Sequence, residues 1–547
     1  MAAATAIVQD RFTTKAKRGD VEMGAQHVRN VLWIMCDQLR WDYLSCYGHP
    51  RLHTPNIDRL ASRGVRFTNA FVQGPVCGPS RMSYYTGRYV TSHGAVWNFV
   101  PMPVGEMTLG DFLRPHGVRV AVAGKTHVEA DRAGLRRLGI DPRSTEGVLA
   151  SEGGFEPFDR DDGIWPPGFA DESHQYTAYL RERGYDGANP WHDHANSAAG
   201  ESGEILSGWN MRHARLPARV REQDSETPYM TRRAIDFIEQ SSDRPWMLHL
   251  SYIKPHWPYV APAPYHAMYG PDDVLPVKQQ QGGLDCAHPV LQGFRNCEVS
   301  RNFSRAEVRD TVIPTYMGLI KQIDDQLGVL FDYLESSGRF DDTMIIFSSD
   351  HGDYLGDHYL GEKELFHDSV AKVPLIIYDP RQNAAPGHVE ERLVEAIDLV
   401  PTVLDAYGLP IPDHVVEGRA LTPLLRGEAP AEWRDAVFSE NDYAFRDFVR
   451  EPVGRPAHGC HMTMVRDHDW KFVHFEGLRP QLFDLRNDPD EFVDLGADPA
   501  YAQVRERFQA RLFDWLRNRR IHPTVSHAAM AGWTRKEDEV GIHIGRW

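Results

Sequence analysis

Cysteine is scarce in this sequence, and long apolar runs are missing from it. The six cysteines among 547 residues show no C-x-x-C spacing, which argues against a disulfide framework and against a zinc site. No run of about 18 apolar residues occurs, so no membrane-spanning helix is predicted. Residues 1–24 lack the apolar core of a signal peptide. We therefore expect a cytoplasmic protein with no membrane partner.

Positive charge is also in deficit. Lys and Arg number 60 against 77 Asp and Glu, and the formal net charge is −17. Such a balance argues against nucleic acid as a partner. It also means that any anionic substrate must be attracted by a local cluster of cations. The length and the ordinary 41% of hydrophobic residues are enough for one large domain and a smaller one.

Apolar runs of strand length alternate with helical patterns along most of the chain. The run at 30–36 is apolar throughout, as in a strand that is buried on both faces. Helices are predicted over 54–64, after Cys77 and over 313–338. Further strands are predicted at 65–72, 118–123, 246–253, 343–349 and 373–378. This alternation predicts an α/β fold with a large, mostly parallel sheet that is flanked by helices.

Changes in composition and in the pattern of predicted strands and helices divide the chain into four parts. We expect an N-terminal arm (1–29), a catalytic α/β domain (30–430), a smaller C-terminal α+β subdomain (431–520) and a polar tail (521–547). Within the second part, residues 130–221 show little periodicity, which is typical of a lid, a specificity insert or an oligomer contact. The two terminal arms lead us to expect a homo-oligomer, either a dimer or a tetramer.

Polar residues follow four of the predicted strands, at the edge where open α/β sheets place their sites. The groups are Asp37-Gln38, Lys125 with His127, Lys254 with His256, and Asp350-His351; Gly361-Glu362-Lys363 follows the last of them. Asp37 and Asp350 offer oxygen ligands for a hard divalent cation, and His351 adds a nitrogen. Two unrelated helix caps are the structural alternative for the aspartates.

The segment Cys77-Gly78-Pro79-Ser80-Arg81 combines a turn with the start of a helix. Residue 77 is then expected at a helix N-terminus, where backbone N–H groups favour an anion. Arg81 lies one turn further on and supplies a fixed cation for a tetrahedral oxyanion. A buried structural cysteine is the alternative interpretation.

This segment resembles the signature of the type I sulfatases, in which C-x-P-S-R marks a cysteine for oxidation to formylglycine. The resemblance covers about residues 30–520 and extends to Gly124-Lys125, Lys254-Pro255-His256, Ser349-Asp350-His351-Gly352 and Leu482-Phe483-Asp484-Leu485. It implies the alkaline phosphatase superfamily fold, one divalent metal ion and maturation of Cys77 by a formylglycine-generating enzyme. The implied metal ligands are Asp37, Cys77, Asp350 and His351.

At some positions this chain departs from the common sulfatase pattern, and the residues found there resemble those of one subgroup. Gln38 and His351 stand where most sulfatases have Asp and Asn, as in the arylsulfatase/phosphonate monoester hydrolases and choline sulfatases. In that subgroup Gln38 lies near the metal without being a sure ligand, and the metal is manganese or calcium; Asn98 and Gln38 are the expected substrate-binding residues. Phosphonate monoester hydrolases carry Tyr and Thr where this chain has Lys125 and His127. These two residues match true sulfatases, so we expect a small-molecule sulfate ester as substrate.

The resemblance also implies a mechanism of the arylsulfatase type. A thiol is a poor nucleophile for sulfate transfer, whereas hydrated formylglycine offers two geminal hydroxyl groups, one to attack sulfur and form a covalent sulfo-enzyme intermediate. Arg81, Lys125 and Lys363 are expected to hold the sulfuryl oxygens. His256, with help from Lys363, is the expected general acid for the leaving group, and His127 the base that releases sulfate.

Three other interpretations remain open on the sequence. The first is a phosphonate monoester or phosphodiester hydrolase with the same site, since both kinds of ester present a singly charged tetrahedron. The second is a binding protein that has lost its chemistry, which the full set of site residues disfavours. The third is a phosphomutase or phosphatase with a Ser or Thr nucleophile, which Cys77 disfavours.

Overall fold

A large central sheet organises the protein in the computed structural model, which describes residues 27–163, 165, 166, 168, 173–280, 288–381, 386–519, 524–533 and 536–543. Within these ranges the sheet has nine strands, in the order β10-β2-β9-β8-β1-β7-β3-β4, with β11 beside β2. The strands are β1 (Asn30–Asp37), β2 (Val65–Phe71), β3 (Arg119–Gly124), β4 (Glu156–Arg160), β7 (Trp246–Pro255), β8 (Thr343–Ser349), β9 (Lys372–Tyr378), β10 (His388–Glu390) and β11 (Val394–Glu395).

The predicted fold class is confirmed. The neighbouring strands β8, β1, β7, β3 and β4 run parallel to one another, and β9 pairs antiparallel with both β8 and β2. Every residue of β1 is buried, as its unbroken apolar run predicts. Because β8, β1, β7 and β3 are adjacent and parallel, their carboxyl ends meet at one edge of the sheet.

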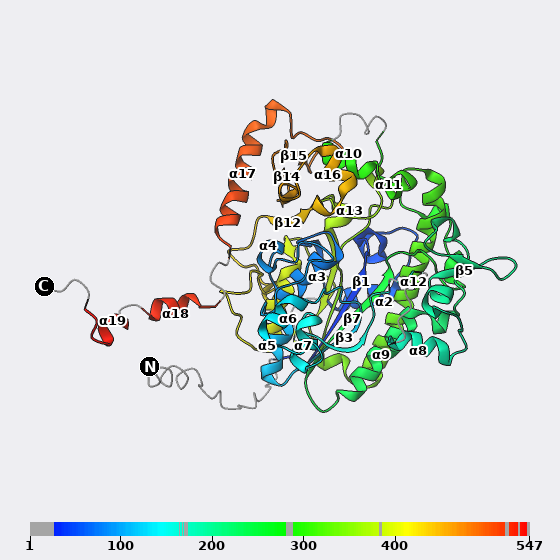
Figure 1. Cartoon of the computed structure of the whole chain (residues 1–547), viewed down its shortest axis with the longest axis horizontal. Coiled ribbons are helices and arrows are strands. Elements are labelled where there is room, and N and C mark those ends of the chain that lie inside the picture. The colour runs from blue at the N-terminus through cyan, green and yellow to red at the C-terminus, as the bar shows by residue number, and fades with distance from the viewer. Residues whose placement is uncertain are drawn as a thin grey trace.

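Helices cover both faces of the sheet (Figure 1). Leu32 and Ile34 of β1 face α2 (Pro55–Arg63), α8 (Gln175–Glu182), α9 (Glu226–Gln240) and α12 (Ala306–Ser336). The alternate residues Val31 and Trp33 face α3 (Cys77–Thr86), α5 (Leu109–Leu113), α14 (Leu399–Ala406) and α15 (Thr422–Leu425). Side chains of a strand alternate between faces, so one apolar run serves two hydrophobic cores.

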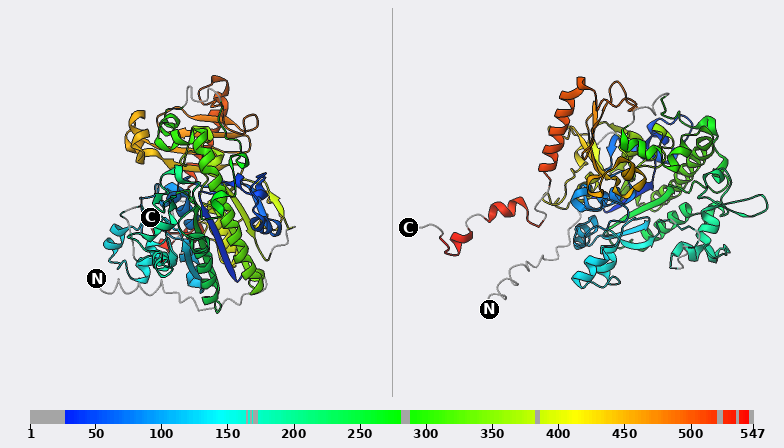
Figure 2. Two further views of the ribbon diagram at one scale, coloured as in Figure 1. Left: turned by 90° about the vertical axis from the view of Figure 1, so that its right-hand side faces the viewer. Right: turned by 45° about the horizontal axis from the view of Figure 1, so that its top comes forward.

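A second sheet lies beside the carboxyl edge of the first. It is antiparallel and consists of β12 (Val437–Asp442), β13 (His461–Arg466), β14 (Trp470–Phe475) and β15 (Gln481–Asp484). One face packs on α17 (Ala502–Arg517), and the other contacts α10 (Pro289–Arg295) and apolar residues of the segment 354–370. Figure 2 shows this sheet and α17 together as one unit on top of the large sheet.

The region 130–221 is more regular than its sequence predicts. It contributes β4 to the edge of the large sheet, where Ala121 to Gly124 of β3 pair with Glu156 to Arg160. It also forms α6 (Arg132–Leu138), α7 (Thr145–Ser151) and the hairpin of β5 (Ser197–Ala199) and β6 (Ile205–Ser207). These elements are too short for sequence periodicity to reveal them.

The remaining helices are short. They are α4 (Val90–His93), α11 (Glu298–Phe303), α13 (Asp368–Ala371), α16 (Asp447–Val453), α18 (His527–Gly532) and α19 (Lys536–Glu539). In Figure 1, α18 and α19 lie away from the body, in the part predicted as a tail. Most of the predicted N-terminal arm (1–29) lies outside the described residues. No helix in the described ranges is long and apolar enough to cross a membrane.

Candidate active site

The site lies at the carboxyl edge of the large sheet. β1 ends at Asp37, β3 leads into Lys125, β7 leads into His256 and β8 leads into Asp350. The backbone at Gly124 has φ +108°, and a Cβ there would overlap the carbonyl oxygen of Ser251, so glycine is required for the turn that delivers Lys125.

Cys77 is the first residue of α3, which enters this edge from the loop after β2. The whole helix is buried, and the Cys77 side chain is fully enclosed. The backbone N–H of Gly78 donates a 2.8 Å hydrogen bond to Oδ1 of Asn98. A side chain at position 78 would crowd the backbone of Asn98, so the segment near Asn98 packs directly on the start of the helix.

Four of the predicted residues form a compact group of ligand atoms. One side-chain atom each from Asp37, Cys77, Asp350 and His351 lies within 4.8 Å of the other three, and all four residues are buried. Nε2 of His351 lies 3.2 Å from Sγ of Cys77 and 3.7 Å from a carboxylate oxygen of each aspartate. Two carboxylates with an imidazole suit a hard divalent cation, so this donor set fits the metal that the sequence predicts.

The histidine of this group is oriented by the backbone. Its Nδ1 lies 2.9 Å from the carbonyl oxygen of Gly352. This contact orients the ring so that Nε2 faces the other three residues of the group. Burial acts to lower the pKa of His351, but the carboxylate of Asp350 and the side chain of Cys77 together outweigh it and raise that pKa. Such a partner for the distal ring nitrogen is usual for an imidazole that serves as a metal ligand.

Two cations stand on the sheet side of the group. Nε of Arg81 donates a 2.8 Å hydrogen bond to Asp350, and its Nη1 donates to the carbonyl oxygen of Lys125 and to Oγ of Ser251, each at 2.8 Å. The Lys125 ammonium group contacts Asp37. Although burial opposes ionisation, Lys125 helps to lower the pKa of Asp37 far below its usual range.

A third cation comes from a strained loop after β8. Nζ of Lys363 lies 3.3 Å from Sγ of Cys77, 3.0 Å from Oε1 of Gln38 and 3.4 Å from Nε2 of His256. Both neighbours of Lys363 have positive φ, 66° at Glu362 and 95° at Glu364, a conformation that costs about 1–3 kcal/mol per residue. The surrounding contacts therefore hold Lys363 in place at a conformational cost.

The electrostatic environment of position 77 favours an anion. Burial alone would raise the pKa of the Cys77 thiol, but the positive charges of Lys125, Lys363 and His351 lower it well below its ordinary value. A residue placed here thus carries negative charge readily, even though it has no access to solvent.

The two remaining predicted histidines also lie near Cys77. Nδ1 of His256 lies 2.6 Å from the carbonyl oxygen of Trp257, and burial lowers the pKa of His256 to about 4. His127 helps to lower the pKa of Cys77 through a side-chain hydrogen bond. Its backbone N–H donates to Asp162, and its φ of 53° turns the chain at this point.

Gln38 lies between the group of ligand atoms and Lys363. Its backbone N–H donates a 3.0 Å hydrogen bond to Oδ1 of Asp350, and its side-chain oxygen accepts from Lys363. Its side-chain nitrogen donates to Asp353, which also accepts a 2.6 Å bond from the Tyr259 hydroxyl group. The amide thus orients Lys363, and the pair of Asp353 and Tyr259 orients the amide.

A cavity of about 1220 Å³ opens above Cys77. Asn98, His127, His256 and Lys363 line its inner end. The cavity also has walls that sequence reasoning missed, formed by Trp97, Phe99, Arg132, Arg136, Arg160 and Arg446. Only the folded chain brings these residues together, since they come from four separate parts of the sequence. The i, i+4 spacing of Arg132 and Arg136 was the one available signal.

Comparison with known proteins identifies the class. The sulfatase family profile matches residues 29–409, and the profile of the C-terminal part of N-sulphoglucosamine sulphohydrolase matches residues 356–518. The first match spans more than half of the 547 residues, so the chain belongs to the sulfatase family, within the alkaline phosphatase superfamily.

The similar proteins include both a sulfatase and a phosphonate monoester hydrolase. The multifunctional alkaline phosphatase superfamily protein PehA of Trinickia caryophylli is 34% identical over 89% of this chain and 95% of its own length. An arylsulfatase of Clostridium perfringens is 26% identical over 92% of this chain and 98% of its own length. The structure of a phosphonate monoester hydrolase from Silicibacter pomeroyi superposes with a TM-score of 0.79 at 28% identity and covers 91% of this chain and 98% of its own.

Proposed function

We propose that this protein hydrolyses sulfate monoesters, with residue 77 as the nucleophile. One observation carries the proposal: Cys77 lies with Asp37, Asp350 and His351 in a group that could hold a metal ion. Its Sγ also lies 3.3 Å from the ammonium group of Lys363, in the lining of a large cavity. This arrangement suits a nucleophile that must approach an anionic tetrahedral ester. Membership of the sulfatase family supports it.

The nucleophile in this proposal is not the thiol itself. Oxidised to formylglycine by a formylglycine-generating enzyme and hydrated, residue 77 would present a hydroxyl oxygen in place of sulfur. Asp37, Asp350, His351 and residue 77 would hold one manganese or calcium ion. When bound, the ion would lower the pKa of that hydroxyl group and offset charge on the ester oxygens.

The cations of the site would then act on the ester. Lys363 and Lys125 supply positive charge on two sides of position 77, in a buried environment where it is weakly screened. The guanidinium group of Arg81 is bound to Asp350 and to the backbone at Lys125, so it holds these two residues in position. Its Nη2 has no hydrogen-bond partner among the described residues and would be available to the ester oxygens.

Proton transfer falls to the two histidines. His256 is the proposed general acid. Its Nδ1 faces a carbonyl oxygen, and its Nε2 lies 3.4 Å from the ammonium group of Lys363, which would supply the proton that His256 passes to the leaving oxygen. His127, which lines the cavity beside Cys77, would serve as the base in the second half of the reaction.

A phosphonate monoester or phosphodiester hydrolase is the second candidate. The similarity of the whole fold to the Silicibacter pomeroyi hydrolase favours it. Lys125 and His127 favour sulfate, because these two residues resemble the pattern of true sulfatases rather than the Tyr and Thr expected of phosphonate monoester hydrolases.

The experiment that separates the two candidates measures kcat/KM for 4-nitrophenyl sulfate and for the 4-nitrophenyl monoester of phenylphosphonic acid. We expect the higher value for the sulfate, and Lys125→Tyr together with His127→Thr should shift the ratio toward the phosphonate. A higher value for the phosphonate in the unaltered enzyme would overturn the preference for sulfate. Activity toward neither ester would overturn both candidates.

A further inference from the structure

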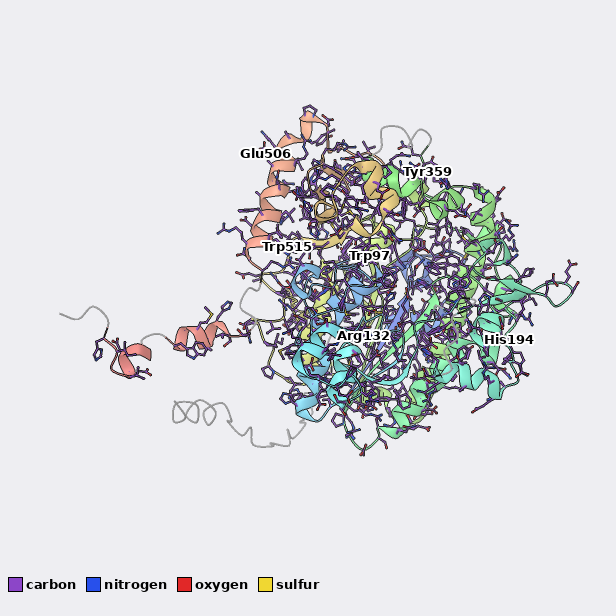
Figure 3. All side chains as sticks on the ribbon, viewed as in Figure 1. Trp97, Arg132, His194, Tyr359, Glu506 and Trp515 are labelled. Atoms are coloured by element: carbon purple, nitrogen blue, oxygen red, sulfur yellow. The ribbon has the colours of Figure 1, made fainter. Side chains whose placement is uncertain are left out.

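Two arginines of α6 face the cavity from the wall beyond His127. Arg132 and Arg136 are separated by one helical turn, both are exposed, and both line the same cavity as Cys77 and Lys363. Trp97 and Arg132, both labelled in Figure 3, belong to walls of this cavity that are distant in sequence.

These two arginines differ from the other arginines of the cavity in their partners. Arg160 pairs with Glu152 at 3.2 Å and with Asp162 at 2.7 Å, and Nε of Arg446 donates a 2.8 Å hydrogen bond to Glu364. In the ranges that the structure describes, neither Arg132 nor Arg136 has an ion pair or a side-chain hydrogen bond. Their charges are available to a ligand.

The position of the pair on the helix strengthens this argument. Like charges four residues apart repel each other, and an anion placed between them offsets that repulsion. Two carboxylates share the wall. Asp141 accepts a 2.9 Å hydrogen bond from the backbone of Arg143 and pairs with that side chain at 3.6 Å, whereas Glu129 is exposed. With Arg143 counted as the partner of Asp141, three arginines stand against two carboxylates here, an excess of one positive charge on a protein of net charge −17.

We propose that Arg132 and Arg136 form a subsite for a second oxyanion, carried by the leaving group of the ester. The substrates would then be esters whose alcohol bears a carboxylate or a phosphate at the end remote from the reacting group. This inference rests on the proposed ester hydrolysis and specifies its substrate class. The cavity, at about 1220 Å³, exceeds the usual 300–1000 Å³ of sites for drug-sized ligands, so it has room for such a group.

The test measures binding without turnover, in the full-length Cys77→Ala protein. The probes are phenyl sulfates whose para substituent ends in a carboxylate, or in the uncharged carboxamide of the same size, on zero, one or two methylene groups. A second series ends in a phosphonate or its neutral diester. We expect at least one anionic probe to bind about tenfold more tightly by calorimetry than its neutral partner.

Substitutions on α6 test whether Arg132 and Arg136 cause the preference for the anionic probe. Arg132→Gln and Arg136→Gln should each remove most of the tenfold preference and leave the affinity for the neutral probe unchanged. Arg137→Gln is the matched control, because Arg137 is exposed on the same helix, lies outside the cavity lining and changes the net charge equally.

Three results would overturn the subsite: equal affinity for anionic and neutral probes in both series, a preference that survives loss of both arginines, or an equal loss in Arg137→Gln. The carboxylate and phosphonate series show which oxyanion the site prefers. Failure of the proposed hydrolysis is a separate outcome, recognised when the unaltered enzyme cleaves neither 4-nitrophenyl sulfate nor the 4-nitrophenyl monoester of phenylphosphonic acid.

Discussion

Nζ of Lys363 lies 3.3 Å from Sγ of Cys77, although 286 residues separate them in the chain. Lys363 is brought there by a loop in which Glu362 and Glu364 adopt positive φ. The side chain of Gln38 accepts a hydrogen bond from the same ammonium group, so three segments meet at this point.

Residue 77 should be modified and indispensable. Cys77→Ala is expected to lose turnover of 4-nitrophenyl sulfate completely, because no other oxygen or sulfur nucleophile occupies its place at the start of α3. Mass spectrometry of the tryptic peptide that ends at Arg81 should show the thiol exchanged for an aldehyde. Cys46→Ala, which alters a half-buried cysteine of another loop, is the control and should retain activity. An unmodified peptide from a fully active enzyme would contradict the prediction.

Loss of His256 should depend on the leaving group. His256→Ala is expected to lower kcat/KM by about 10²–10⁴-fold for alkyl sulfates, because their alkoxide must be protonated as it leaves. It should have a far smaller effect on 4-nitrophenyl sulfate, whose phenolate leaves without a proton. The measurement is the slope of log kcat/KM against the pKa of the leaving alcohol. Equal losses along the series would assign His256 to another role.

Metal removal should reduce both activity and stability. The carboxylates of Asp37 and Asp350 each lie 3.7 Å from Nε2 of His351, and a ligand that binds only the folded protein stabilises it by about 2.7 kcal/mol at 100 times its Kd. We expect chelation to lower Tm and manganese or calcium to restore it. In His351→Ala the restoring shift should shrink or vanish. The same Tm with and without the ion in the unaltered protein would contradict a metal site.

Arg446 should couple the small sheet to the site. Its guanidinium group pairs with buried Glu364, next to Lys363, and lies 5.1 Å from the ring centre of Trp97, next to Asn98. We expect Arg446→Ala to cost about 1–3 kcal/mol of unfolding free energy, because a buried carboxylate loses its partner. The double variant Arg446→Ala with Glu364→Gln should recover stability. Denaturant titration measures both, and kcat should fall because Lys363 loses its support.

Stability should fall in acid through Asp368. Burial opposes ionisation of this residue, but Lys471, whose Nζ lies 2.6 Å away, helps to lower the pKa of Asp368 far below its ordinary value of 3.8. A group with a lowered pKa in the folded state stabilises it above the ordinary pKa, and this stabilisation is lost as the pH falls below that value. The unfolding free energy of Asp368→Asn should thus approach that of the unaltered protein as the pH drops below 3.8. A difference independent of pH would contradict the ion pair.

Sequence patterns alone predicted the principal strands, the long helix α12 and the polar residues at four strand ends. They could do so because strands buried on both faces must be apolar throughout, and because strand ends are read directly from where apolar runs stop. The helix at Cys77 was predicted from Pro79 and the residues around it. These features depend on residues that are close together in the sequence, so local sequence patterns are enough to predict them.

The tertiary structure alone decided the order of the strands, the reversal of β9 and the composition of the cavity walls. The strand order β8-β1-β7-β3 places Asp350, Asp37, His256 and Lys125 at one edge, and no local pattern encodes that order. Arg446 reaches the cavity from the region after β12, and Arg132 and Arg136 reach it from a segment that has little periodicity. Such contacts depend on long-range packing, which joins residues that carry no common signal in the sequence.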